Sequence, residues 1–320
     1  MLDTRHSVRR SATISQMATP DGFAVHTFPQ DGLVALSREV YDSTPLLMAE
    51  IRPGVVVLAG AGGNITAILG SRESAIIDTG YVSRVAEIEN EVTGGYGRPP
   101  RWVINTHWHF DHTDGNSAFA AAGATILGHA NCRGRLSTDQ YVPSLSWHIS
   151  ASPRGAWPSI TFDQPLVVDV GTEELHLLPQ APAHTDGDVA VLLPSANVLI
   201  TGDLFTHHSY PVIDGSSGGS LRGMIEAVDR LLPLLDAGTI VVPGHGAVTD
   251  RTELVSFRDM LRTAEDRILA MIEAGRKPCE IATARPTADF DSVWGRGYVT
   301  GEHFTRMALS GMSLAVPPLD

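Results

Sequence analysis

Short apolar runs separated by glycine-rich or polar turns dominate the chain from residue 54 onward. Such runs, rich in β-branched and aliphatic residues and bounded by turn formers, are typical of buried strands. The pattern predicts strands at Val55–Leu58, Ile65–Leu69, Ala75–Asp78, Trp102–Asn105, Ala124–Leu127, Leu166–Val168, Leu175–Leu178, Val189–Leu193, Val198–Ile200 and Ile240–Val242.

Four segments between these strands have the apolar spacing of helices, and they lie at Ser83–Val92, Ser117–Ala122, Leu221–Leu235 and Glu253–Ala274. Residues 137–165 show no regular pattern and contain several prolines and serines. Because strands and helices come in strand-rich halves rather than in strict alternation, the order favours an α/β fold in layers over a doubly wound sheet.

The chain has 320 residues, enough for one large domain or two small ones. Residues 1–50 hold no strong periodic pattern, so we expect an extension that packs on the core or lies at a homodimer interface. The regular pattern places the main domain at residues 51–275 and leaves 276–320 as a C-terminal extension.

The net charge is −13, from 36 acidic and 23 basic residues, which disfavours a nucleic-acid partner because phosphate binding needs a basic face. No apolar run is long enough to cross a membrane. The basic N-terminal residues are not followed by the apolar stretch of a signal peptide, so we expect a cytoplasmic protein.

Cys132 and Cys279 are the only cysteines, and they lie far apart in sequence. This excludes a disulfide framework and makes a thiolate zinc site improbable. We therefore expect two ordinary reduced thiols.

The highest density of potential metal ligands follows the strand predicted at Trp102–Asn105. Within six residues the chain places three imidazoles and one carboxylate, at His107, His109, Asp111 and His112. These four side chains could not all point at one ion. Two on alternate residues can converge on one metal, and the other two are placed for a second, so the motif predicts a pair of metals.

Three further positions end predicted strands and stand beside glycines or within turns: His184, Asp203 and His245. Imidazole and carboxylate are the usual ligands of first-row metals, and histidine-rich sites favour zinc. We expect His107, His109 and His184 to hold one zinc ion, leaving an open position.

Asp111, His112 and His245 would then hold a second zinc ion, and Asp203 would bridge the two. Two zinc ions so placed would bind a hydroxide between them that exists near neutral pH. The expected catalyst is thus a metal-bridged hydroxide, which makes Asp111 and Asp203 catalytic as well as metal-binding. His207 and His208, just after Asp203, could reach the substrate or protonate its leaving group; they could equally be loop residues.

The motif His107-x-His109-x-Asp111-His112, followed in order by His184, Asp203 and His245, resembles that of the metallo-β-lactamase superfamily of hydrolases. The resemblance runs from about residue 55 to residue 245. It implies an αββα four-layer sandwich with a dinuclear site at one edge, between two sheets. It also implies that Asp78 braces the metal-binding loop through hydrogen bonds and is not itself a ligand.

Two positions depart from well-known branches of this family. Position 203 is Asp where several zinc β-lactamases carry a cysteine ligand, which argues against antibiotic hydrolysis. Position 109 is His where the diiron oxygen-reducing members carry a carboxylate, which favours zinc.

The substrate class stays open at this point. The first expectation is hydrolysis of a small-molecule ester, lactone, thioester or amide. The alternatives are a hydrolytic dehalogenase of a chlorinated aromatic such as chlorothalonil, a mononuclear-iron sulfur dioxygenase, and a binding protein that kept the fold without catalysis. Nuclease members are disfavoured by the acidic balance and by the lack of a large insertion between Asp203 and His245.

Overall fold

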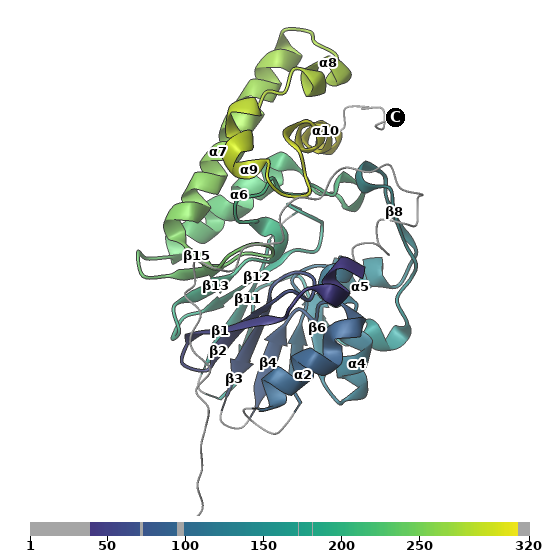
Figure 1. The fold of residues 1–320 in the computed structure, drawn as a ribbon, viewed down its shortest axis with the longest axis vertical. Helices are drawn as coiled ribbons and strands as arrows, with labels where there is room; N and C mark the ends of the chain where they lie inside the picture. Colours follow the sequence, from purple (N-terminus) through teal and green to yellow (C-terminus); the bar gives the residue numbers. More distant parts are fainter. Residues whose placement is uncertain (1–38, 71–72, 95–98, 172, 181, 313–320) are drawn as a thin grey trace, which may run out of the picture.

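The computed structural model describes residues 39–70, 73–94, 99–171, 173–180 and 182–312. They form two large sheets that pack face to face and carry helices on their outer faces (Figure 1). The predicted four-layer αββα sandwich is therefore confirmed.

The first sheet has seven strands in the order β1-β2-β3-β4-β5-β6-β9. Their bounds are β1 Leu47–Arg52, β2 Val55–Ala59, β3 Ile65–Leu69, β4 Ser74–Ile77, β5 Trp102–Ile104, β6 Thr125–His129 and β9 Ile160–Phe162. Strands β1 to β4 pair antiparallel, whereas β4, β5, β6 and β9 pair parallel.

The second sheet has six strands in the order β10-β11-β12-β13-β14-β15. Their bounds are β10 Leu166–Asp169, β11 Glu174–Pro179, β12 Val189–Leu193, β13 Val198–Ile200, β14 Ile240–Val242 and β15 Thr249–Asp250. Only β13 and β14 pair parallel, connected through the helix α6.

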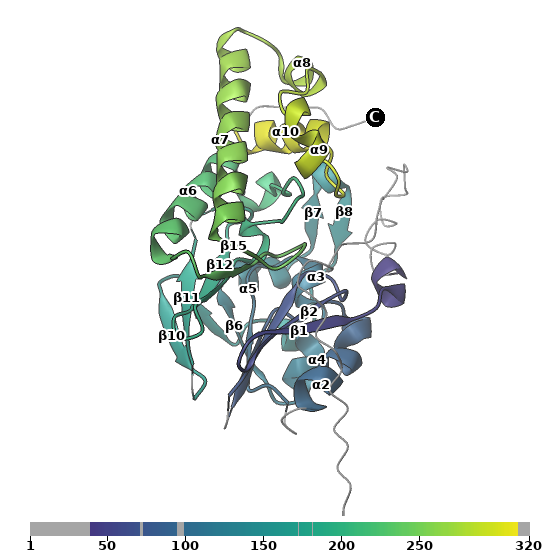
Figure 2. The ribbon, with the colours of Figure 1, turned by 60° about the vertical axis from the view of Figure 1, so that its left-hand side comes forward.

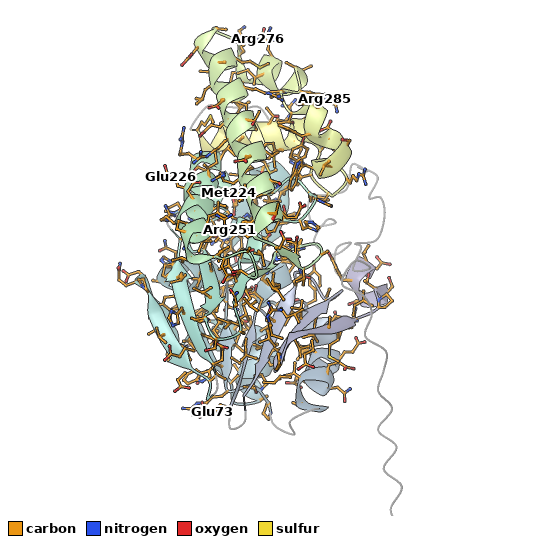
Figure 3. The ribbon with its side chains drawn as sticks, turned by 90° about the vertical axis from the view of Figure 1, so that its left-hand side faces the viewer. Glu73, Met224, Glu226, Arg251, Arg276 and Arg285 are labelled. Atoms are coloured by element: carbon orange, nitrogen blue, oxygen red, sulfur yellow. The ribbon has the colours of Figure 1, made fainter. Side chains whose placement is uncertain are left out.

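The α-helices are α2 Val85–Gly94, α3 Phe110–Thr113, α4 Asn116–Ala121, α5 Ala130–Leu136, α6 Leu221–Leu231, α7 Arg251–Glu273, α8 Pro278–Thr283, α9 Asp291–Trp294 and α10 Gly301–Gly311. Figure 3 shows Arg251 near the level of the sheets and Arg276 at the far end of the molecule, so α7 extends well beyond the sandwich. No helix among the described residues has both the length and the apolar character needed to span a membrane.

Alternating side chains of the strands build the layers, because successive residues of a strand point to opposite faces. Val55 and Val57 of β2 pack between the two sheets, whereas Val56 and Leu58 pack against α2 and α4. The outer face of the second sheet packs on α6 and α7, where Met224 is fully buried.

Residues 137–165 are more regular than the sequence predicted. They contain the hairpin β7 Gln140–Val142 and β8 Trp147–Ile149, and β9 extends the first sheet as an edge strand. These strands have three residues each, too few to show a period, and β9 depends on its pairing with β6.

The segment beyond residue 275 folds back onto the sandwich (Figure 2). Helix α10 packs against α8 and α7, and Phe304 lies in the same core as α6. At the other end, the predicted extension lies outside the described residues up to residue 38, and its predicted end at residue 50 falls inside β1.

Candidate metal centre

Loops at the strand ends bring the predicted ligands to one edge of the sandwich. His107 and His109 follow β5, with Asp111 and His112 in α3, while His184 follows β11. Asp203 lies in the single turn after β13, and His245 follows β14. Five of these side chains are buried and those of Asp111 and His245 are partly exposed, and the structure brings all seven together.

Asn64 links the two sheets at this edge. Its backbone N–H donates to the Gly244 carbonyl at 2.7 Å, and its side-chain amide donates to the carbonyls of Pro243 and Gly246, both at 2.9 Å. The loop after β2 thereby fixes the loop that carries His245.

His107, His109 and His184 form the first half of the centre. His107 Nε2 and His184 Nε2 lie 3.1 Å and 2.9 Å from His109 Nδ1. These separations suit three nitrogens around one ion at the usual zinc–nitrogen distance of about 2.1 Å.

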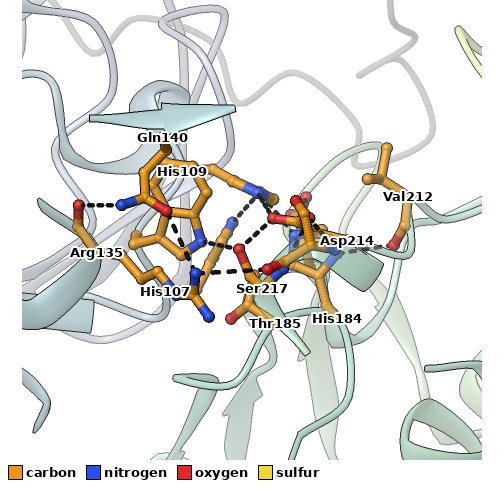
Figure 4. Close-up of polar contacts among 12 residues, drawn as sticks. His107, His109, Arg135, Gln140, His184, Thr185, Val212, Asp214 and Ser217 are labelled. Atoms are coloured by element: carbon orange, nitrogen blue, oxygen red, sulfur yellow. Dashed lines mark hydrogen bonds and ion pairs between the residues drawn. The ribbon is translucent and has the colours of Figure 1, made fainter. Parts of the chain in front are cut away.

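The other nitrogen of each of these rings has a fixed partner. His109 Nε2 donates to Asp214 Oδ2 at 3.1 Å, and His184 Nδ1 donates to the Val212 carbonyl at 2.8 Å (Figure 4). A neutral imidazole carries one proton, so the nitrogens that face each other across the centre hold lone pairs.

Thr106 and Asp78 likewise fix the ring proton of His107 on the nitrogen that faces away from the centre. Thr106 Oγ1 donates to Asp78 Oδ2 at 2.7 Å, so it accepts from His107 Nδ1 at 3.0 Å. Asp78 Oδ2 also accepts from His112 Nδ1 at 2.8 Å, and Asp78 Oδ1 accepts from the Thr106 N–H at 2.8 Å. Asp78 therefore supports ligands of both halves, as the family resemblance implied.

Asp111, His112 and His245 form the second half. His245 Nε2 lies 3.2 Å from Asp111 Oδ2 and 3.3 Å from His112 Nε2. Asp203 lies between the halves, with Oδ1 3.3 Å from His112 Nε2 and Oδ2 3.7 Å from His184 Nε2.

Converging lone pairs and carboxylates call for a cation. Asp203 Oδ1 is buried and, apart from the 3.3 Å ion-pair contact with His112 Nε2, has no hydrogen-bond partner among the described residues. A Cβ at position 244 would collide with this same oxygen, so glycine is needed there for the carboxylate to enter the centre. The donor set of imidazole and carboxylate, together with this unpartnered oxygen, fits a pair of first-row metal ions.

Electrostatics differ between the halves. Burial lowers the pKa of His107 well below its usual value and that of His184 to about 4. Burial also disfavours charge on His112 and His245, but Asp111 and Asp203 outweigh it, and both pKa values rise well above the usual 6.5.

Both carboxylates stay ionised in this environment. Burial alone would raise the pKa of Asp111, but His112 and His245 bring it down to about 2. Burial acts on Asp203 in the same way, yet the pKa falls well below its usual range because of His245 and His112.

Asp214 is a supporting residue that the sequence did not single out. It is fully buried, and its carboxylate accepts from the backbone N–H groups of Ser216 and Ser217, from both their hydroxyls, and from His109. The run Asp-Gly-Ser-Ser is typical of a turn closed by an aspartate side chain, a signal for the turn but not for the partner.

His207 and His208 are not part of the cluster of seven. Their rings stack on each other at 3.9 Å and face Glu253, with His207 Nε2 3.9 Å and His208 Nε2 3.5 Å from Glu253 Oε2. The backbone N–H of His207 donates to the His245 carbonyl at 2.9 Å, so the pair borders the centre.

Comparisons with known proteins agree with this geometry. The family model described as Metallo-beta-lactamase superfamily matches residues 59–245. The Acyl-coenzyme A thioesterase MBLAC2 of Homo sapiens is 23% identical over 214 residues, covering 58% of this chain and 74% of the human protein.

A hydroxyacylglutathione hydrolase of Anaeromyxobacter dehalogenans is 29% identical over 174 residues, which cover 54% of this chain and 57% of that enzyme. Among solved structures, a metallo-beta-lactamase from Pontibacter korlensis superposes with a TM-score of 0.58 at 19% identity, covering 68% of this chain and 99% of that one. The fold, the ordered ligands and the matched region agree: the chain belongs to the metallo-beta-lactamase superfamily and is a metal-dependent hydrolase.

Proposed function

We propose that the protein is a dinuclear zinc hydrolase of acyl compounds, with thioesters as the first substrate class and esters, lactones and amides as related ones. The observation that carries the proposal is the convergence of imidazole lone pairs and ionised carboxylates on one buried space. The metal ligands are His107, His109 and His184 for one ion, Asp111, His112 and His245 for the other, and Asp203 for both.

Two zinc ions bound here would supply a water that ionises near neutral pH and a Lewis acid for the carbonyl oxygen of the substrate. The chain's own part is to hold the ligands. Asp78 and Asp214 fix the direction of the ligand histidines, and burial of His107 and His184 keeps them neutral. The relatives named as an acyl-coenzyme A thioesterase and a hydroxyacylglutathione hydrolase support acyl transfer to water as the reaction.

His207 and His208 are proposed to deliver the proton to the leaving group. Glu253 faces both rings, and burial and His208 lower the pKa of His207, whereas the charge of Glu253 opposes this shift. With a poor leaving group, His208→Gln should lower kcat and shift its pH profile; with a p-nitrophenolate leaving group it should have little effect. An equal loss for both leaving groups would contradict the acid role.

The most informative experiment is a substrate panel on zinc-loaded protein with metal analysis of the same sample. Thioesters, esters, lactones, β-lactams and chlorinated aromatics should be compared. We expect two zinc ions per chain and fastest turnover of a thioester. Chloride release from chlorothalonil without acyl hydrolysis would instead select the dehalogenase, and one iron per chain without zinc would select a sulfur dioxygenase.

A further inference from the structure

Four aromatic side chains form a cluster beside the metal centre, and we call Tyr41, Tyr81, Phe110 and Trp147 the aromatic cluster. Ring centroids are 5.3 Å apart for Tyr41 and Tyr81, 5.9 Å for Tyr81 and Phe110, and 5.1 Å for Phe110 and Trp147. Tyr81 and Phe110 are buried, whereas Tyr41 and Trp147 are half-buried. The outer two rings therefore offer the accessible faces.

Trp147 adjoins the first half of the centre. Its ring meets that of His109 edge to face, with centroids 5.9 Å apart. Trp147 lies on β8, and the turn of this hairpin is fixed from the C-terminal segment, since His303 Nε2 donates to the Ser144 carbonyl at 2.6 Å. Figure 2 shows β7 and β8 between the C-terminal helices and α3.

Tyr41 is held at the other end of the aromatic cluster. The buried guanidinium of Arg84 donates to the carbonyls of Tyr41, Thr44 and Gly60, which anchors the helical residues 39–43 to the first sheet. The ring of Tyr41 is thereby fixed beside that of Tyr81.

We propose that the aromatic cluster binds the apolar acyl group of the substrate. Binding sites for small molecules are commonly lined by apolar and aromatic side chains. The inference rests on the proposed hydrolysis and adds a substrate class, medium-chain acyl compounds. It also accounts for Trp147 and Tyr41 coming from segments outside the metal-binding loops.

The test is a series of p-nitrophenyl esters from acetate to octanoate on zinc-loaded protein. Each buried methylene should raise kcat/KM about fourfold. Trp147→Ala should flatten this rise by at least about tenfold between acetate and octanoate, and Trp147→Phe should restore most of it. Unchanged chain-length dependence in a folded, zinc-loaded Trp147→Ala would overturn the proposal.

Tyr141→Ala is the matched control. Tyr141 lies on β7 of the same hairpin and pairs with His148, so it points to the opposite face from Trp147. This variant should keep the full chain-length dependence. A flattening as large as that of Trp147→Ala would show a disturbed hairpin and would overturn the assignment to Trp147.

A measurement without turnover separates this inference from the proposed function. Calorimetric titration should show octanoate binding to the zinc-loaded protein at least about tenfold more tightly than acetate, and Trp147→Ala should remove the difference. Preference for octanoate in a protein that hydrolyses no ester would refute the function and leave the inference standing. Ester hydrolysis with equal binding of both acids would refute the inference alone.

Discussion

The two halves of the centre differ in exposure and in charge. In the first half the side chains of His109 and His184 are 3% and 1% exposed, and the outward ring nitrogens of the three histidines are held by Asp214, Thr106 and a carbonyl. In the second half the side chains of Asp111 and His245 are 14% and 27% exposed, and carboxylates lie next to imidazoles. The first half is a buried set of three prearranged ring nitrogens, whereas in the second half carboxylates and imidazoles stabilise each other's charged forms and the side chains are more exposed.

This difference predicts that the two halves bind metal with different affinity. Buried histidines with lowered pKa values, as in the first half, bind an ion with little competition from protons. A set whose histidines favour the protonated form gives up its ion more readily and lies closer to the solvent from which substrate arrives.

Removing the link between the halves should have the largest effect. Asp203→Ala deletes the carboxylate that lies 3.3 Å from His112 Nε2 in one half and 3.7 Å from His184 Nε2 in the other, so we expect loss of one zinc ion and at least about a thousandfold drop in kcat. Metal analysis and steady-state kinetics measure both. Asp229→Ala, at a surface carboxylate paired with Arg258 and Arg262, is the control and should keep two ions and full activity.

Lowering the pH should release the ion of the second half before that of the first half. Because the pKa values of His112 and His245 are raised, these ligands take up protons first as the pH falls, whereas His184 with a pKa of about 4 stays neutral. Affinity for the second ion should fall by up to about a hundredfold per pH unit when two ligands must lose protons. Zinc content after dialysis between pH 7.5 and 5 checks this. Simultaneous loss of both ions would contradict the predicted difference between the two halves.

Asp214→Asn should weaken the first half selectively. The substitution removes the charge that orients His109, and loss of such an outer partner costs about 10- to 100-fold in metal affinity. Competition with a chromogenic zinc chelator measures the tighter site, and Asp229→Asn controls for the change in net charge. Equal affinity in wild type and variant would mean that Asp214 serves only the fold of its loop.

Ser217→Ala should have the smallest effect. Its hydroxyl donates to Asp214 at 2.5 Å and accepts from Trp108 Nε1 at 3.1 Å, so its loss leaves a buried indole N–H without its partner. We expect about 1 kcal/mol lower stability of the apoprotein and only a severalfold change in zinc affinity. Thermal unfolding of the apoprotein tests this, with the exposed Ser256→Ala as control.

The sequence located the candidate ligands, which the structure brings together, more readily than the residues that support them. His184, Asp203 and His245 could be found because each ends a strand with a clear apolar run, and strand ends meet at one edge of a sandwich. Asp214 could not, because its partner His109 lies 105 residues away and the pairing exists only after folding. The contact of Tyr41 with Tyr81 was hidden for the same reason, since no local period marks a contact between distant aromatic rings.

The fold could likewise be predicted from the sequence only in part. Long apolar runs and helical spacing predicted the layers, while β7, β8 and β9 are too short to carry a pattern and take their form from tertiary pairing. The charge states of the second half likewise depend on residues that only folding brings together. His112 and His245 have raised pKa values only because folding places Asp111 and Asp203 beside them.

Titration of the apoprotein with zinc tests the central claim most directly. At pH 7.5, calorimetry should show two zinc ions bound per chain in the wild type, and one in Asp203→Ala. One ion in the wild type, or two in Asp203→Ala with activity retained, would contradict a dinuclear centre bridged by Asp203.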